Sequence, residues 1–124
     1  VVPLSNEVIS FLKELYSITG VELYLFPNSQ HLNKHMSNNT VNTALRKMGF
    51  SKDEQTAHGL RAMFKTVCKD NQIKHNLKNE FVEMVLAHQT MGSVEEAYNR
   101  AENLNEKRII TNWWSSYLND LIEA

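Results

Sequence analysis

The chain has 124 residues, of which 42% are hydrophobic and 22% charged, a composition that fits one folded domain and excludes a disordered or low-complexity chain. Its single cysteine excludes an internal disulfide, and its longest apolar stretches are far shorter than the roughly 20 residues that span a bilayer, so we expect a cytoplasmic protein without a membrane segment. The net charge is −1, but residues 46–78 carry eight lysines and arginines against three acids, which makes the middle third the part best suited to bind an anion, although solvated helix lysines would give the same pattern.

The first half of the chain predicts two helices with a short extended segment between them. Apolar residues at helical spacing, preceded by Ser5 as a candidate N-cap, predict a helix over about residues 6–18. Leu23–Phe26, closed by a Pro-Asn-Ser turn, predicts a brief strand followed by a loop. A second helix is expected to start at Ser37 and to end at Gly49, because glycine is common just after helix C-termini.

The second half predicts helices throughout. Thr56 precedes an expected helix over about 57–70, a polar stretch follows, and a fourth helix includes Phe81 and Leu86. A capping-box pattern at Ser93 predicts a short helix that includes Tyr98. The fold class is therefore mainly α, a single domain over residues 1–124 with at most a short β segment.

A wide apolar stripe marks the last helix and must be buried. It packs either on the core of its own domain, which we favour, or on a neighbouring subunit. Its members are Ile110, Trp113, Trp114, Tyr117, Leu118, Leu121 and Ile122.

Basic and imidazole side chains gather on one face of the expected third helix. At about 100° per residue, His58, Arg61, Lys65 and Lys69 fall within a sector of roughly 80°, opposite the apolar residues of that helix. The first turn of a helix favours anions such as phosphate, and an arginine fork can donate two parallel hydrogen bonds to phosphate oxygens. On spacing alone, this pattern is also common by chance.

Three motifs in order along the chain resemble the tyrosine recombinases. They are His58-Gly59-Leu60-Arg61, then Leu86-Ala87-His88, then Tyr98 ten residues further on. In that family a His-x-x-Arg pair, a second His after a Leu-Gly pair, and a Tyr occur in the same order near the C-terminus. Ala87 stands where the family more often has glycine, which we interpret as a minor change.

Sequence around these motifs is similar to the prophage and genomic-island integrases. The stretches that carry this similarity are 36–49, Ala97-Tyr98-Asn99-Arg100-Ala101-Glu102 and Trp113-Trp114-Ser115-Ser116-Tyr117-Leu118. The resemblance covers most of the chain.

The resemblance implies site-specific DNA recombination that moves a prophage or genomic island into and out of a bacterial chromosome. Arg61 would hold the scissile phosphate with His58 and His88, and Tyr98 would attack it to give a 3′-phosphotyrosyl bond. Neither a metal nor a cofactor is implied. The implied partner is duplex DNA, held by a homotetramer in the synapse, in the nucleoid of the cytoplasm. Further implied DNA contacts are Lys65, Lys69, Arg46 and Lys47.

Two further catalytic residues of the family, an arginine and a lysine, would lie before residue 1. The chain begins Val1-Val2-Pro3, with neither an initiator methionine nor a signal-peptide pattern. We therefore expect the C-terminal part of an integrase catalytic domain, without the family's DNA-arm domain and inactive alone, since losing one preorganised donor costs about 3 kcal/mol of transition-state stabilisation.

Two alternatives from other classes stay open. One is a non-catalytic helical DNA-binding module, which would tolerate Tyr98→Phe without penalty. The other is a protein-interaction domain that uses the C-terminal aromatic helix and has no salt-sensitive affinity for DNA. The remaining histidines, His31, His35 and His75, are interpreted as loop or surface residues.

Overall fold

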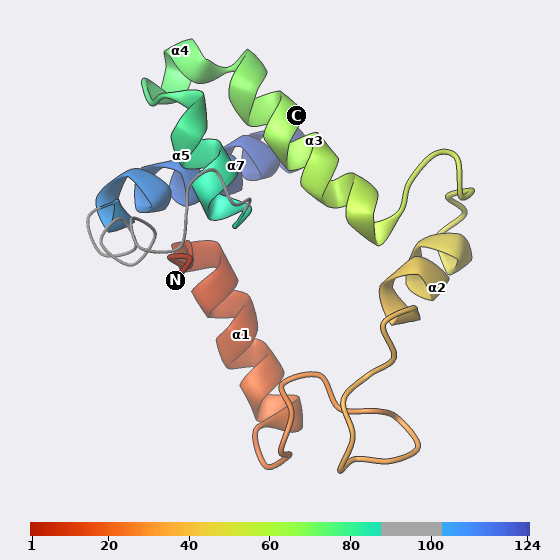
Figure 1. Cartoon of the computed structure of the whole chain (residues 1–124). Helices are drawn as coiled ribbons and strands as arrows, with labels where there is room; N and C mark the ends of the chain where they lie inside the picture. Colours follow the sequence, from red (N-terminus) through yellow and green to blue (C-terminus); the bar gives the residue numbers. More distant parts are fainter. Residues whose placement is uncertain (88–102) are drawn as a thin grey trace. The chain divides into compact units, whose positions relative to one another are not determined.

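The computed structural model describes residues 1–87 and 103–124, and helices dominate them (Figure 1). Within these ranges no strand forms, so the prediction of a mainly α fold is confirmed. The chain divides into two compact units: Val1–Glu7 with Arg61–Ala124, called the cored unit below, and Val8–Leu60, called the polar unit. The helices are α1 (Asn6–Thr19), α2 (Thr40–Lys47), α3 (Ala57–Asp70), α4 (Gln72–His75), α5 (Asn79–Val85) and α7 (Leu104–Glu123).

The cored unit is built on a small apolar cluster shared by three helices. Phe64 and Cys68 come from α3, Val82 from α5 and Ile110 from α7, and Leu86 follows the end of α5. The rings of Phe64 and Trp114 meet edge to face, with centroids 5.2 Å apart.

The apolar stripe of α7 packs inside its own unit. Trp113 and Trp114 lie against the core cluster, and α5 crosses α7 and packs against it (Figure 1). Of the two alternatives for the stripe, docking on its own core is therefore the one observed. The end of the stripe stays uncovered, since Leu121 and Ile122 are exposed.

The polar stretch after α3 contains the short helix α4, which the sequence pattern did not predict, and the interpretation of His75 as a loop or surface residue is wrong. His75 is buried. Its Nδ1 accepts from the Leu77 N–H at 3.3 Å, which leaves the proton on Nε2, 2.7 Å from the Cys68 carbonyl oxygen. Its ring meets Trp113 edge to face at 5.2 Å. The imidazole is buried because each ring nitrogen has a backbone partner.

The start of the chain is fixed to α7 by buried hydroxyl groups. Ser5 Oγ donates to Ser115 Oγ across 3.0 Å. The pKa of Glu7 is lowered by its own backbone N–H and by the Ser115 hydroxyl. This segment therefore belongs to the cored unit, although most of α1 belongs to the polar unit.

The polar unit contains a tight turn where a strand was expected. Leu23–Phe26 forms bends rather than a strand, and the only β-type pairing in the described residues is a bridge between Pro27 and His35. Asn28 donates its N–H to the Lys34 carbonyl at 2.8 Å. A strand needs a continuous ladder with a neighbour, and here the pairing spans only the mouth of one loop.

Helix α2 is shorter than predicted at its start. Ser37 Oγ accepts from the Asn39 N–H at 3.3 Å, which makes a turn, and the helix begins at Thr40. Its end agrees with the prediction, because Gly49 has a φ of 99° and stops the helix in the left-handed region. No residue between Val8 and Leu60 is buried, so hydrogen bonds rather than a core organise this unit.

Candidate phosphate and DNA site

Helix α3 presents the first predicted motif in its first two turns. Thr56 Oγ1 accepts from the Gly59 N–H at 2.9 Å, which caps the helix and explains why it begins at Ala57, as predicted. His58 and Arg61 follow one turn apart, and both are exposed. The first motif is therefore accessible from solvent.

Arg61 contacts the backbone of the second predicted motif. Its Nη2 donates to the Leu86 carbonyl oxygen at 2.5 Å, across 25 residues of sequence. Leu86 is buried beside Phe64 in the core, so this carbonyl is a fixed acceptor. Leu86 is the first residue of the second motif, so this hydrogen bond joins the first motif to the second through the Leu86 backbone.

Ala87 adopts a backbone conformation that suits glycine. After α5 ends, Ala87 donates its N–H to the Met84 carbonyl at 3.1 Å and has a φ of 53°. An L-residue with a Cβ in this region costs roughly 1–2 kcal/mol. The departure from glycine is therefore larger than the sequence alone indicated. His88 and Tyr98, with the helix expected from Ser93, lie outside the described residues.

Lys65 and Lys69 share one carboxylate. Their Nζ atoms each lie 2.8 Å from Oε1 of Glu83 on α5, and their side chains are 37% and 35% exposed. Glu83 is 14% exposed and offsets one of the two positive charges. The basic face of α3 is thus partly neutralised by α5, a pairing that the spacing on α3 could not reveal.

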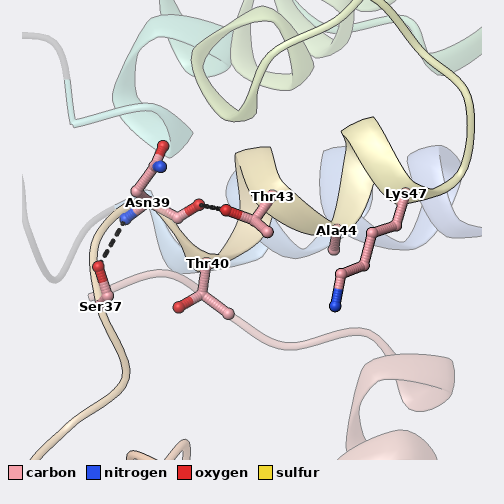
Figure 2. Close-up of a pocket in the computed structure, with 6 residues that line it drawn as sticks. All are labelled: Ser37, Asn39, Thr40, Thr43, Ala44 and Lys47. Atoms are coloured by element: carbon pink, nitrogen blue, oxygen red, sulfur yellow. Dashed lines mark hydrogen bonds between the residues drawn. The ribbon is translucent and has the colours of Figure 1, made fainter.

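Arg46 and Lys47, adjacent in sequence, have different surroundings. The guanidinium of Arg46 donates to the Phe50 and Gln55 carbonyl oxygens in the loop that leads to α3. Lys47 instead lines an open pocket of about 270 Å³. Figure 2 shows Thr40, Ala44 and Lys47 projecting on one side of α2.

Five of the six residues that line the pocket on α2 have polar or charged side chains. Asn39 has hydrogen bonds on both sides, from its N–H to Ser37 Oγ and from Thr43 Oγ1 to its carbonyl at 3.1 Å (Figure 2). With Lys47 at its edge, the pocket offers hydroxyl groups and one cation, which are suitable partners for a phosphate group.

Sequence reasoning missed Asn42 and Glu83. The Oδ1 of Asn42 accepts from the Ala57 N–H, one of the free donors at the start of α3, at 2.8 Å. No local pattern marks an acceptor 15 residues away. Its position one turn before Arg46 on α2 was the only available signal.

Other kinds of site find no support in residues 1–87 and 103–124. No three His, Cys, Asp or Glu side chains there are grouped so that they could hold a metal ion. No helix in these ranges is long and apolar enough to cross a membrane. Burial raises the pKa of the Cys68 thiol to about 12, which makes it a poor nucleophile.

Comparison with known proteins decides the family. Residues 1–104 match the profile of the phage integrase family. The chain belongs to the phage integrase family. This confirms the family resemblance derived from the three motifs.

Integrases of phages and prophages are among the relatives of this chain. It is 36% identical over 120 residues to the integrase of Enterobacteria phage P4, which covers 95% of the chain and 27% of that relative. It is 32% identical over 124 residues to the prophage integrase IntS of Escherichia coli K12, 99% of the chain and 31% of the relative. The integrase of Shigella phage Sf6 is 32% identical over 123 residues. The chain thus spans less than a third of these relatives, and no solved structure matches it.

Proposed function

We propose that this integrase chain is the C-terminal part of the catalytic domain of a tyrosine recombinase that integrates and excises a prophage or genomic island. Membership of the phage integrase family supports it, as do the phage and prophage integrases among its relatives. The substrate is duplex DNA at attachment sites. The protein acts in the bacterial cytoplasm, on the nucleoid.

In the proposed reaction, Arg61, His58 and His88 bind the scissile phosphate, and Tyr98 attacks it. The Tyr98 phenol loses its proton as its oxygen forms a bond to phosphorus. The bond to the 5′-oxygen breaks, and the departing oxygen takes a proton to become a 5′-hydroxyl. A phenol with a pKa near 10 is a weak nucleophile at neutral pH. Cationic donors lower the barrier because they stabilise charge that develops on the phosphoryl oxygens.

One observation carries the proposal furthest. The guanidinium of Arg61 is hydrogen-bonded to the Leu86 carbonyl at 2.5 Å, so the first motif contacts the chain two residues before His88. A phosphate clamp needs donors from several segments at one point, and this hydrogen bond joins the segments that carry the first and the second motif. The contact supports a shared phosphate site.

The other proposed DNA contacts are lysines and one arginine on α2 and α3. Lys65 and Lys69 supply net positive charge beyond their pairing with Glu83. Lys47, which lines the pocket on α2, contacts the phosphate backbone directly. Arg46, which is hydrogen-bonded to the loop before α3, adds its positive charge there. In the full-length protein, four copies assemble on two sites, and an upstream arginine and lysine complete the catalytic group, so the chain alone does not cleave DNA.

Covalent trapping in the full-length protein tests the proposal. The probe is a nicked duplex that carries the junction between the mobile element and the chromosome, because a nick lets the cleaved end diffuse away and blocks religation. We expect a denaturant-resistant protein–DNA adduct that is lost in Tyr98→Phe and reduced at least about hundredfold in Arg61→Ala.

Each other outcome contradicts part of the proposal. An adduct that survives Tyr98→Phe removes Tyr98 as the nucleophile. Salt-sensitive DNA binding without any adduct identifies a non-catalytic binding module instead. Concentration-dependent self-association with no DNA affinity identifies a protein-interaction domain.

A further inference from the structure

Two side chains on one face of α2 form hydrogen bonds with the loop before α3 and with the first turn of α3, which contains His58. We call this pair of contacts the brace. The acceptor is Asn42 Oδ1, which takes the Ala57 N–H at 2.8 Å. The donor is Arg46, one turn later on the same face, whose guanidinium bonds the Phe50 and Gln55 carbonyls. All of these residues lie within the polar unit.

The two side chains fix both ends of the segment that leads to His58. Arg46 bridges the start and the end of the loop, since Phe50 follows α2 closely and Gln55 comes just before α3. Asn42 then binds the N–H of Ala57, the residue immediately before His58. A backbone held on both sides of this loop has little freedom to displace the imidazole.

The loop has its own internal support, which adds to the brace. Ser51 donates its N–H to Glu54 Oε2 at 2.7 Å, and Glu54 donates its N–H to Ser51 Oγ at 3.3 Å. This reciprocal pair lowers the pKa of Glu54, mainly through the Ser51 N–H, with a smaller effect from the charge of Arg46. The loop is therefore folded on itself as well as held by α2.

The hydrogen bonds from α2 matter because the polar unit has no buried core. No residue between Val8 and Leu60 is buried, so apolar packing does not fix the start of α3 in this unit. A catalytic group must be held to within a fraction of an ångström, and supporting hydrogen bonds commonly supply that precision.

The two faces of α2 have different surroundings. At about 100° per residue, the direction shared by Asn42 and Arg46 is roughly 130° from that of Thr40 and Lys47, which project together beside the pocket in Figure 2. The face with Thr40 and Lys47 is accessible to DNA. The face with Asn42 and Arg46 is hydrogen-bonded to the backbone of the loop before α3 and of its first residue.

We propose that Asn42 and Arg46 are positioning residues that act on DNA cleavage through His58. This rests on the proposed function, in which His58 binds the scissile phosphate. Neither residue is assigned contact with the reacting atoms in this role. Because Arg46 is charged and could also attract DNA, the uncharged Asn42 provides the cleaner test.

The first arm of the experiment measures backbone protection in the chain itself. In Asn42→Ala, we expect hydrogen exchange at the Ala57 amide to rise about tenfold, since its acceptor is gone. Asn42→Asp keeps an oxygen at that position and restores protection. Arg46→Lys keeps the charge but not the double donor, so exchange across residues 50–55 rises. Lys52→Met, which removes a charge from an exposed lysine of the same loop, is the matched control and leaves exchange unchanged.

The second arm measures single-turnover cleavage of the nicked duplex by the full-length protein. Asn42→Ala lowers the cleavage rate about tenfold, whereas the Kd for DNA changes less than about twofold. In a His58→Ala background, Asn42→Ala costs nothing further, because a residue that acts through His58 has no effect once His58 is gone. A merely structural role would lower the rate equally in both backgrounds.

The outcomes separate this inference from the function on which it rests. An equal loss in both backgrounds, or unchanged exchange at Ala57 in Asn42→Ala, overturns the brace while the recombinase assignment stands. If the unaltered protein forms no adduct with the nicked duplex, the proposed function fails and the positioning role fails with it.

Discussion

The cored unit and the polar unit are stabilised in different ways. In the cored unit, Phe64, Cys68, Val82, Leu86 and Ile110 form a buried cluster. In the polar unit no side chain is buried, and the loop before α3 is held by hydrogen bonds from α2. Helix α3 begins in one unit and ends in the other. The two proposed phosphate ligands on α3 therefore depend on different physical support: His58 on polar contacts and Arg61 on a core-fixed carbonyl.

The largest expected effect comes from a cavity in the cored unit. Ile110→Ala empties a fully buried site and should lower the free energy of unfolding by about 3 kcal/mol. Urea titration measures this. Alkylation of Cys68, the only cysteine, measures opening of the core independently, because the thiol is buried and its pKa is raised to about 12.

The matched control for Ile110 lies in the polar unit. Leu45→Ala on α2 removes a side chain that is only half-buried, and should cost about 1 kcal/mol or less. Equal losses at the two positions would show that the units do not differ in how they are stabilised.

The next effect concerns the two residues of the cored unit whose backbone lies in the left-handed region. Ala87→Gly should stabilise the protein by about 1 kcal/mol, because glycine adopts a φ of 53° without penalty. Asn76, with a φ of 54°, tests the opposite change, and Asn76→Ala should destabilise by a similar amount. Thermal unfolding measures both, and a destabilised Ala87→Gly variant would contradict the strain assigned to Ala87.

A smaller effect is expected from the carboxylate that pairs with α3. Glu83→Gln releases the charge of Lys65 and Lys69 and should tighten binding of duplex DNA by the chain about threefold at low salt, with a steeper dependence on salt. Glu80→Gln on the same helix is the control, since Glu80 is exposed and pairs only with Lys78 at 3.9 Å among the described residues. Equal changes in the two variants would mean that only net charge matters.

The smallest effect is the acid response of the loop before α3. The pKa of Glu54 is lowered below its ordinary value of 4.5, so its contribution to stability is complete above that value and is lost as the pH falls through the lowered pKa. Exchange at the Ser51 amide should then rise, after correction for the intrinsic pH dependence of exchange. Glu54→Gln should remove this response, and its persistence in that variant would assign it to another group.

The sequence predicted elements where local chemistry decides them. Thr56 and the apolar period gave α3 its observed bounds, and the left-handed Gly49 ended α2 as expected. The short α4 was missed because its four residues include one apolar side chain, Ile73, and are too few to show an apolar period. His75 was misplaced because its burial depends on the Cys68 carbonyl and Trp113, which no spacing along the chain reveals.

The candidate site was predicted only in part, for the same reason. The motifs identified His58 and Arg61 as residues of interest, but the contact of Arg61 with Leu86 spans 25 residues and follows from how α3 and α5 pack. The hydrogen bond of Arg46 to the Gln55 carbonyl and the pairing of both lysines with Glu83 likewise depend on tertiary structure. Charge counting alone treats all of these cations as equal.

Mass spectrometry of the covalent adduct tests the central claim most directly. The full-length protein is reacted with the nicked duplex and digested with nuclease and protease, and the peptide that retains nucleotide is sequenced by fragmentation. The account predicts a nucleotide joined through its 3′-phosphate to Tyr98. A nucleotide on any other residue, or protein recovered unmodified after complete strand cleavage, would contradict it.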